Sequence, residues 1–333
     1  MKRTTKKPQE TSPKNSLLSF DGGGIRGLIS AKWVTYLESQ LKGRACRDVT
    51  GILAGTSTGS IIAAALAIGL PASDLVTLYR ERGREIFPAA ATRRWSRFKR
   101  SVSQGLSAPR YSEEGLEKVL KDCFKKTRLG DASGALLLIP SYNTFTRQAK
   151  VFKSNKDEHK SLMLWEVVKS SCSAPAYFPA HLLQMDDVEC PLIDGGVVAN
   201  NPTACAIAEL VRMSPEETKL QTLRDIVVGS FGTGQTTRAI VANEAREWGA
   251  LEWAIPVIDV LFDGAADAVD YIAEQLVPEG NYIRCQTKLD HAYDDMDNAD
   301  ATNLAALLAL SQRFLDDEGG ALALQKLAKK LLV

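Results

Sequence analysis

The stretch VTGILAGTSTGSIIAAALAI (residues 49–68) decides the fold, because it joins two apolar runs through one short turn. The run at residues 49–54 predicts a buried strand, and residues 61–68 predict a buried helix. Between them, GTSTG (residues 55–59) has the Gly-x-Ser-x-Gly spacing of a nucleophile elbow. Its glycines allow a sharp turn, and the helix that follows points its partial positive end toward the Ser57 hydroxyl. Ser57 is the predicted nucleophile, and the alternative is a turn without chemistry.

A glycine-rich loop lies upstream of this stretch. Residues 17–20 predict a short buried strand, and DGGGIRG (residues 21–27) leads into a helical pattern that runs to about residue 41. Consecutive glycines expose backbone amides, which can stabilise an oxygen that becomes negative during acyl transfer. The residues predicted to form this oxyanion site are Gly22, Gly23, Gly24 and Arg26, the last of which adds positive charge.

The same loop also satisfies the dinucleotide-binding fingerprint, Gly22-x-Gly24-x-x-Gly27. Two features oppose that interpretation. Asp21 would place a carboxylate beside a pyrophosphate, and the next predicted strand ends in the elbow at Gly55 instead of an acid for the ribose. Asp48 has roughly the right spacing but opens that strand. An oxyanion site is therefore favoured over a nicotinamide cofactor.

A third motif, PLIDGGV (residues 191–197), predicts a short strand that runs into an acid and two glycines. Asp194 is held at the strand end, and the glycines let another chain or a substrate approach closely. The alternative is a plain Asp-Gly turn, which is a common turn dipeptide. The combination of three motifs favours a functional role for Asp194.

A serine nucleophile usually requires a base, and histidine is the usual one. None of the three histidines fits well. His159 lies in a charge run typical of a solvated loop, His181 is typical of a half-buried ring, and His291 is surrounded by aspartates. The remaining interpretation is direct activation of Ser57 by Asp194. An ordinary aspartate has a pKa of about 3.9, so this role requires burial beside an apolar pocket that raises the pKa.

These residues together resemble the motifs of the patatin-like acyl hydrolases, Ser–Asp dyad enzymes that deacylate phospholipids and other acyl esters. The resemblance continues through residues 165–179 and 232–234 and covers nearly everything after residue 16. It implies a three-layer α/β/α fold with a mostly parallel sheet, a Ser57–Asp194 dyad, and an oxyanion site in the glycine loop. It also implies a serine carboxylic-ester hydrolase without cofactor or metal. The alternative is a non-catalytic lipid-binding or storage protein of the same fold.

Composition agrees with one enzyme-sized domain at residues 16–333, because the chain has 333 residues of which 45% are hydrophobic. Residues 1–15 are polar and basic, which predicts a disordered tail and not a signal peptide. Residues 61–70 form the longest clearly apolar run and are too few to cross a bilayer. Scattered cysteines indicate reduced thiols. The expected location is cytoplasmic and peripheral to a membrane.

Charge is unevenly placed although the net charge is only +1, which gives no reason to expect nucleic acid as a partner. RRWSRFKR (residues 93–100) packs five cations and two aromatic residues into eight positions. Such a segment suits an anionic membrane surface, and the alternative is a solvated loop. The candidate membrane-contact residues are Arg93, Arg94, Trp95, Arg97 and Phe98. The sequence leaves open a homodimer, a small-molecule activator and the lipid class.

Overall fold

The computed structural model describes residues 15–89, 109–253 and 256–333, and these build a central eight-stranded sheet. The strand order is β5-β6-β3-β2-β1-β7-β8, and β4 pairs with β3. Pairing is parallel from β3 across β2, β1 and β7 to β8, and antiparallel for β4, β5 and β6. The strands are β1 (Ser16–Phe20), β2 (Ile52–Gly55), β3 (Leu136–Asn143), β4 (Gln148–Lys153), β5 (His181–Met185), β6 (Val188–Asp194), β7 (Val227–Phe231) and β8 (Tyr282–Cys285).

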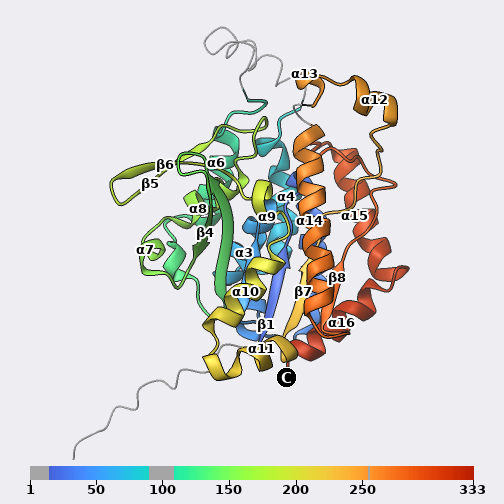
Figure 1. Cartoon of the computed structure of the whole chain (residues 1–333). Helices are drawn as coiled ribbons and strands as arrows, with labels where there is room; N and C mark the ends of the chain where they lie inside the picture. Colours follow the sequence, from blue (N-terminus) through green and yellow to red (C-terminus); the bar gives the residue numbers. More distant parts are fainter. Residues whose placement is uncertain (1–14, 90–108, 254–255) are drawn as a thin grey trace, which may run out of the picture.

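Helices cover both faces of this sheet (Figure 1). The first face carries α1 (Gly27–Gln40), α3 (Thr58–Ala67), α4 (Ala72–Ile86), α6 (Glu114–Phe124), α8 (Leu164–Cys172), α15 (Ala301–Asp316) and α16 (Gly320–Leu331). The second face carries α9 (Gly196–Ala199), α10 (Thr203–Met213) and α14 (Pro256–Leu276). Shorter helices are α2 (Cys46–Val49), α7 (Asp157–Lys160), α11 (Lys219–Asp225), α12 (Ala242–Glu247) and α13 (Ala250–Trp253).

Alternation along the strands produces two separate hydrophobic cores. Leu18 and Leu53 point into the larger core, which is shared with α1 and α3. Their neighbours Leu17 and Ile52 point into the smaller core on the α10 side. Because successive side chains of a strand face opposite sides, a strand buried on both faces reads as a continuous apolar run. The predicted α/β fold with three layers and a mostly parallel sheet core is confirmed.

The register of β3 brings β2 and β6 onto one edge. Leu138 pairs with Ala54 of β2 on one side and with β4 on the other, and Ser141 pairs with Asp194 of β6 and with β4. Because β4 pairs with one edge of β3 at residues 138–143, β2 and β6 share the other edge, β2 at residues 136–138 and β6 at residues 141–143. The end of β6 therefore lies next to the turn that follows Gly55.

The strand predicted for residues 49–54 begins later than expected. Residues Cys46–Val49 form the short helix α2, and Thr50 ends it by donating both its amide and its hydroxyl to the Cys46 carbonyl. Asp48 therefore lies in a helix and does not open the strand. The tail at residues 1–15 falls, except for its last residue, outside the described part of the chain. Within that part, no helix combines the length and apolarity needed to cross a bilayer.

Gly59 allows α3 to start close against the end of β1. A Cβ atom at Gly59 would lie 2.1 Å from the Phe20 carbonyl oxygen, whereas a Cβ at Gly264 in α14 would meet no atom within 4 Å. We expect Gly59→Ala to lower the free energy of unfolding by about 1–3 kcal/mol. The control Gly264→Ala should raise it by about 0.5–1 kcal/mol. Urea denaturation measures both, and a Gly59→Ala protein as stable as the wild type contradicts the expectation.

Candidate active site

Ser57 lies at the tip of a sharp turn between β2 and α3. Its backbone has φ 52° and ψ −124°, a conformation that residues with a side chain rarely adopt. Such strain persists only where the surroundings enforce it, and it is common at active sites. Gly55 permits the turn, since a Cβ there would lie 2.1 Å from the Gly59 carbonyl oxygen. The Ser57 hydroxyl is thereby presented at the end of the sheet.

Hydrogen bonds on both sides hold the strained turn in place. The Ser57 amide donates to Ser171 Oγ at 2.9 Å, and this hydroxyl donates in turn to the Pro140 carbonyl at 2.7 Å. On the other side, Ser60 Oγ donates to the Ser57 carbonyl at 2.6 Å. Both backbone polar groups of Ser57 are therefore engaged, and the side-chain hydroxyl remains available for chemistry.

Asp194 is fully buried at the end of β6. Its Oδ1 accepts a hydrogen bond from the Gly196 amide at 2.7 Å, and its Oδ2 has no hydrogen-bond partner within normal distance and angle limits. Burial raises the pKa of Asp194 to about 7, while the Gly196 amide and the Ser57 hydroxyl lower it. The Ser57 hydroxyl therefore lies near this carboxyl group, whose pKa falls in the range that suits a base near neutral pH.

The glycine loop differs from the prediction at Gly22. Its amide donates to the Asn200 carbonyl at 3.0 Å, so it cannot donate to a substrate oxygen. The amides of Gly23 and Gly24 form no hydrogen bond within the described residues. Gly24 has φ 58°, and a Cβ there would lie 2.1 Å from the Met296 carbonyl oxygen, so only glycine fits without strain. Two free amides, not three, are available in the loop.

Arg26 is buried and supports the loop from within. Its Nε donates to the Gly23 carbonyl at 3.3 Å, and its Nη1 donates to the Asp294 carbonyl at 3.2 Å. A bond to the Gly23 carbonyl fixes the peptide plane that carries the Gly24 amide. Arg26 therefore orients an amide donor, in addition to the positive charge that the sequence suggested.

An apolar pocket with an empty volume of about 520 Å³ opens at Ser57. Its lining residues are Gly24, Ser57, Thr58, Ile61, Tyr79, Ile86, Phe87, Leu116, Cys172, Ala174, Tyr177, Phe178, Phe262 and Met296. No Lys, Arg, Asp or Glu is among them. The pocket therefore suits an apolar ligand.

Tyr79 contacts Thr58, the residue that follows Ser57. Its hydroxyl lies 2.5 Å from Thr58 Oγ1 and 3.1 Å from the Thr58 carbonyl oxygen. Tyr79→Phe removes both contacts and keeps the ring in the pocket. We expect a fall in kcat of about 3- to 10-fold with little change in KM, because one neutral hydrogen bond contributes about 1 kcal/mol. Steady-state kinetics on a soluble ester checks this, and an unchanged kcat contradicts a positioning role.

None of the three histidines, all in described parts of the chain, lines this pocket. His159 is buried against Phe152, and its Nδ1 accepts a hydrogen bond from the Lys153 amide, so the expected solvated loop is wrong. Burial lowers the pKa of His159 and of His181 to about 4. The His291 side chain is exposed. Among the described residues, no histidine therefore stands beside Ser57 as Asp194 does.

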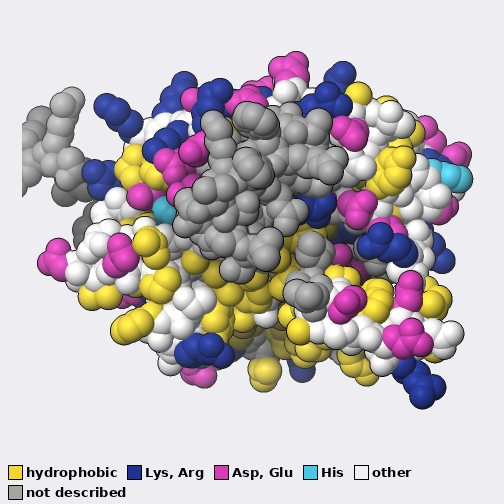
Figure 2. All heavy atoms as spheres, turned by 90° about the horizontal axis from the view of Figure 1, so that it is seen from above, with side chains coloured by type: hydrophobic (Ala, Val, Ile, Leu, Met, Phe, Trp, Pro, Cys, Tyr) yellow, Lys and Arg dark blue, Asp and Glu magenta, His cyan; other side chains and the backbone are white. Residues whose placement is uncertain are grey.

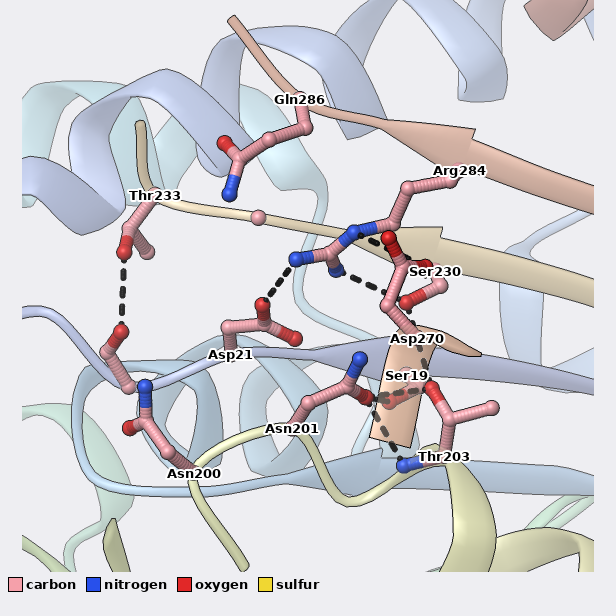
Figure 3. A network of polar contacts seen from close by, with 12 residues as sticks. Ser19, Asp21, Asn200, Asn201, Thr203, Ser230, Thr233, Asp270, Arg284 and Gln286 are labelled. Carbon is pink, nitrogen blue, oxygen red and sulfur yellow. Dashed lines mark hydrogen bonds and ion pairs between the residues drawn. The ribbon is translucent and has the colours of Figure 1, made fainter. Parts of the chain in front are cut away.

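A polar network behind the glycine loop was missed by the sequence analysis (Figure 3). Arg284 donates to Asp21 Oδ2 at 2.6 Å and to Ser230 Oγ at 2.9 Å. Thr233 Oγ1 donates to the Gly22 carbonyl at 2.8 Å. From the sequence, Asp21 counts only as a carboxylate that opposes nucleotide binding. Its burial beside Arg284 instead anchors the start of the loop.

The five membrane-contact residues predicted at 93–98 lie outside the described residues.

A serine at the tip of a strand–turn–helix, with a buried carboxyl group and free amides nearby, places the chain among the α/β proteins that carry a nucleophile elbow. The family model of patatin-like phospholipases matches residues 18–207. The chain belongs to the patatin-like phospholipase family, and this membership supports hydrolysis of lipid acyl esters.

Relatives from plants cover most of the chain. Patatin-like protein 1 of Oryza sativa subsp. indica is 31% identical, across 90% of this chain and 81% of that protein. Patatin-like protein 1 of Arabidopsis thaliana is 30% identical, across 93% of this chain and 83% of that protein. Among solved structures, VipD from Legionella pneumophila aligns over 91% of this chain and 67% of that chain, with 14% identity and a TM-score of 0.41.

Proposed function

We propose that the protein is a serine lipid acyl hydrolase of the phospholipase A or lysophospholipase type. The observation that supports this most directly is the strained Ser57 at the mouth of an apolar pocket, beside a buried carboxyl group whose pKa is raised to about 7. An apolar pocket selects an acyl chain, and the raised pKa suits a base. The family membership supports an acyl lipid as substrate.

In the proposed reaction, Ser57 Oγ attacks the carbonyl carbon of the ester and Asp194 takes the hydroxyl proton. The carbonyl oxygen becomes negative and receives hydrogen bonds from the Gly23 and Gly24 amides. The Thr58 amide, which follows the nucleophile and has no hydrogen-bond partner among the described residues, is a third donor. One such donor contributes about 10²- to 10³-fold, so the loop matters as much as the base.

The tetrahedral intermediate then collapses, and the ester C–O bond breaks. The proton held by Asp194 moves to the departing alcohol oxygen, which leaves as a lysolipid or a deacylated head group. In the second half, a water molecule attacks the acyl-enzyme and Asp194 takes a proton from it. The free fatty acid leaves and Ser57 regains its proton, so the enzyme returns to its starting state.

Incubation with a total lipid extract tests this function. We expect mass spectrometry to detect free fatty acids and matching lysolipids, and a fluorophosphonate probe to label Ser57. The same incubation with Ser57→Ala should give neither. A wild-type protein that binds lipid vesicles but releases no fatty acid and takes no label would instead be a lipid-binding or storage protein. The released products would also identify the lipid class and acyl position.

We further propose that the protein works at a membrane surface through Arg93, Arg94, Trp95, Arg97 and Phe98. Support comes from their sequence and from Phe87, which precedes this segment in the sequence and lines the apolar pocket at Ser57. The face seen in Figure 2 carries a group of hydrophobic side chains near its centre. Anionic lipids attract each nearby cation by about 1 kcal/mol.

Reversal of two charges in this segment tests the membrane proposal. We expect Arg94→Glu with Arg97→Glu to lower hydrolysis of anionic vesicles by at least about tenfold, because each reversal replaces an attraction by a repulsion. Hydrolysis of a soluble short-chain ester should stay unchanged. The control pair Lys42→Glu and Lys329→Glu lies outside this segment, in a pocket next to the C-terminal residue Val333. If the protein with Arg94→Glu and Arg97→Glu still hydrolyses anionic vesicles at the wild-type rate, the proposed membrane contact is excluded.

A further inference from the structure

A loop at residues 294–297, between β8 and α15, contacts both the glycine loop and the wall of the apolar pocket. Its Met296 carbonyl accepts a hydrogen bond from the Ile25 amide at 2.8 Å. Its Asp294 carbonyl accepts one from Arg26 Nη1 at 3.2 Å. These bonds hold the two residues that directly follow the amide donors of the glycine loop. The position of the proposed oxyanion donors therefore depends on this loop.

The Asp297 side chain of the same loop holds a different part of the chain. Its Oδ2 accepts a hydrogen bond from the Tyr111 hydroxyl at 2.6 Å and pairs with Arg110 Nη1 at 2.8 Å. The Asp297 side chain is only 5% exposed, so water and salt screen these contacts little. Hydrogen bonds to an ionised group are about twice as strong as those between neutral groups. Asp297 is therefore firmly attached to this segment.

Tyr111 connects Asp297 with three residues that line the pocket. Its ring packs on Phe87 and on Phe178, with ring centroids 5.6 Å apart in both pairs. Its amide donates to the Tyr177 carbonyl at 2.8 Å. Phe87, Tyr177 and Phe178 all line the apolar pocket. An apolar chain that fills the pocket therefore packs against an aromatic wall whose position depends on Asp297.

Other contacts keep the loop folded without the Asp297 carboxylate. Asn303, which is buried near the start of α15, accepts the Tyr293 amide at 3.0 Å. Its Nδ2 donates to the Asn298 carbonyl at 2.8 Å. These bonds hold the chain on either side of residues 294–297. Replacement of Asp297 therefore cuts the link to the aromatic wall and leaves the anchors of the loop in place.

We propose that Asp297 is a positioning residue through which the acyl chain of the substrate acts on the oxyanion donors. This role rests on the function proposed for Ser57. A chain that fills the pocket fixes the aromatic wall, and Tyr111 passes this constraint to Asp297. The neighbouring Met296 carbonyl then fixes the glycine loop. Binding energy from the non-reacting chain is thereby used at the reacting carbonyl group, which raises kcat. A chain too short to reach the wall gains nothing from Asp297.

Steady-state kinetics with p-nitrophenyl butanoate and p-nitrophenyl octanoate tests this role. For the wild type, we expect kcat to be at least about tenfold higher with the octanoate than with the butanoate. In Asp297→Asn, kcat for the octanoate should fall about tenfold, because the charged partner of Arg110 and Tyr111 is lost. The value of kcat for the butanoate should change by less than about twofold. A merely structural role would lower both rates by the same factor.

Two further variants complete the test. Tyr111→Phe keeps the ring against the pocket and removes the hydroxyl that donates to Asp297, so it should also lower the ratio of the two kcat values. Asp295→Asn is the matched control in the same loop. It should leave both rates unchanged, because Asp295 is exposed and its carboxylate lies 3.9 Å from Arg238 Nη1. Thermal unfolding shows whether each variant is folded, and Tyr111→Phe decides the question if Asp297→Asn is not.

The possible outcomes separate this role from the proposed function. The role of Asp297 is overturned if the wild type has the same kcat for both esters, or if the folded variants keep the wild-type ratio. In either case, ester hydrolysis that is lost in Ser57→Ala would still support the proposed function. A wild-type protein that hydrolyses neither ester would contradict the proposed function itself, and the role of Asp297 with it.

Discussion

Replacement of Ser57 by alanine is expected to reduce the rate of lipid ester hydrolysis by at least about 10⁴-fold. The reaction proposed above requires a covalent acyl bond to Ser57 Oγ, and no other hydroxyl occupies the tip of the elbow. Any residual hydrolysis would come only from binding of the substrate and from the backbone amides that donate to its carbonyl oxygen. The variant should keep its fold, because the Ser57 side chain makes no hydrogen bond on which the turn depends and its amide and carbonyl stay engaged.

The measurement uses released fatty acid together with fluorophosphonate labelling. Ser39→Ala is the matched control, because Ser39 is an exposed serine on α1 whose hydroxyl contacts only its own helix and the neighbouring Gln40. It should keep full activity and full labelling. A Ser57→Ala protein that has a native circular dichroism spectrum and still hydrolyses lipid would show that another group is the nucleophile. The dyad proposal would then be abandoned.

Local features of the site could be predicted from the sequence because each depends on a few consecutive residues. The glycines at 55 and 59 and the apolar runs on either side identify the turn at Ser57. Asp194 could be identified because a strand pattern ends in an acid and two glycines. In the structure, a Cβ at Gly195 would lie 2.3 Å from the Pro140 carbonyl oxygen, which explains one of these glycines physically.

Features that depend on distant parts of the chain could not be predicted. Asp21 and Arg284 form an ion pair although 263 positions separate them, and no local pattern reports such a contact. The engagement of the Gly22 amide depends on the Asn200 carbonyl, which a sequence cannot place. His159 lies among charged residues in sequence, yet its ring packs on Phe152. Tertiary contacts override the local signal in each case.

The replacement Asp194→Asn is expected to lower kcat/KM by about 10²- to 10⁴-fold, the usual contribution of a positioned base. Asparagine keeps the shape and can still accept the Gly196 amide bond, but it cannot take a proton. For the wild type, kcat/KM should rise tenfold per pH unit up to a plateau above about pH 7, because burial raises the pKa of Asp194 to about 7. Asp187→Asn, in the exposed turn between β5 and β6, should leave rate and profile unchanged. A wild-type rate that is flat down to pH 4 would contradict Asp194 as the base.

The raised pKa of Asp194 also distinguishes a variant that has lost its base from a variant that is unfolded. The ordinary pKa of 3.8 applies to the unfolded chain, so between about pH 4 and pH 7 the folded protein holds more protons at Asp194 than the unfolded chain does. Stability therefore falls as pH rises through this window, and the full cost of the buried charge is present above pH 7. Asp194→Asn removes that cost. Relative to the wild type, the variant should gain stability between pH 4 and pH 8 while remaining inactive. Denaturant titrations at both pH values measure this difference, and a variant that is inactive because it is unfolded would show the opposite result.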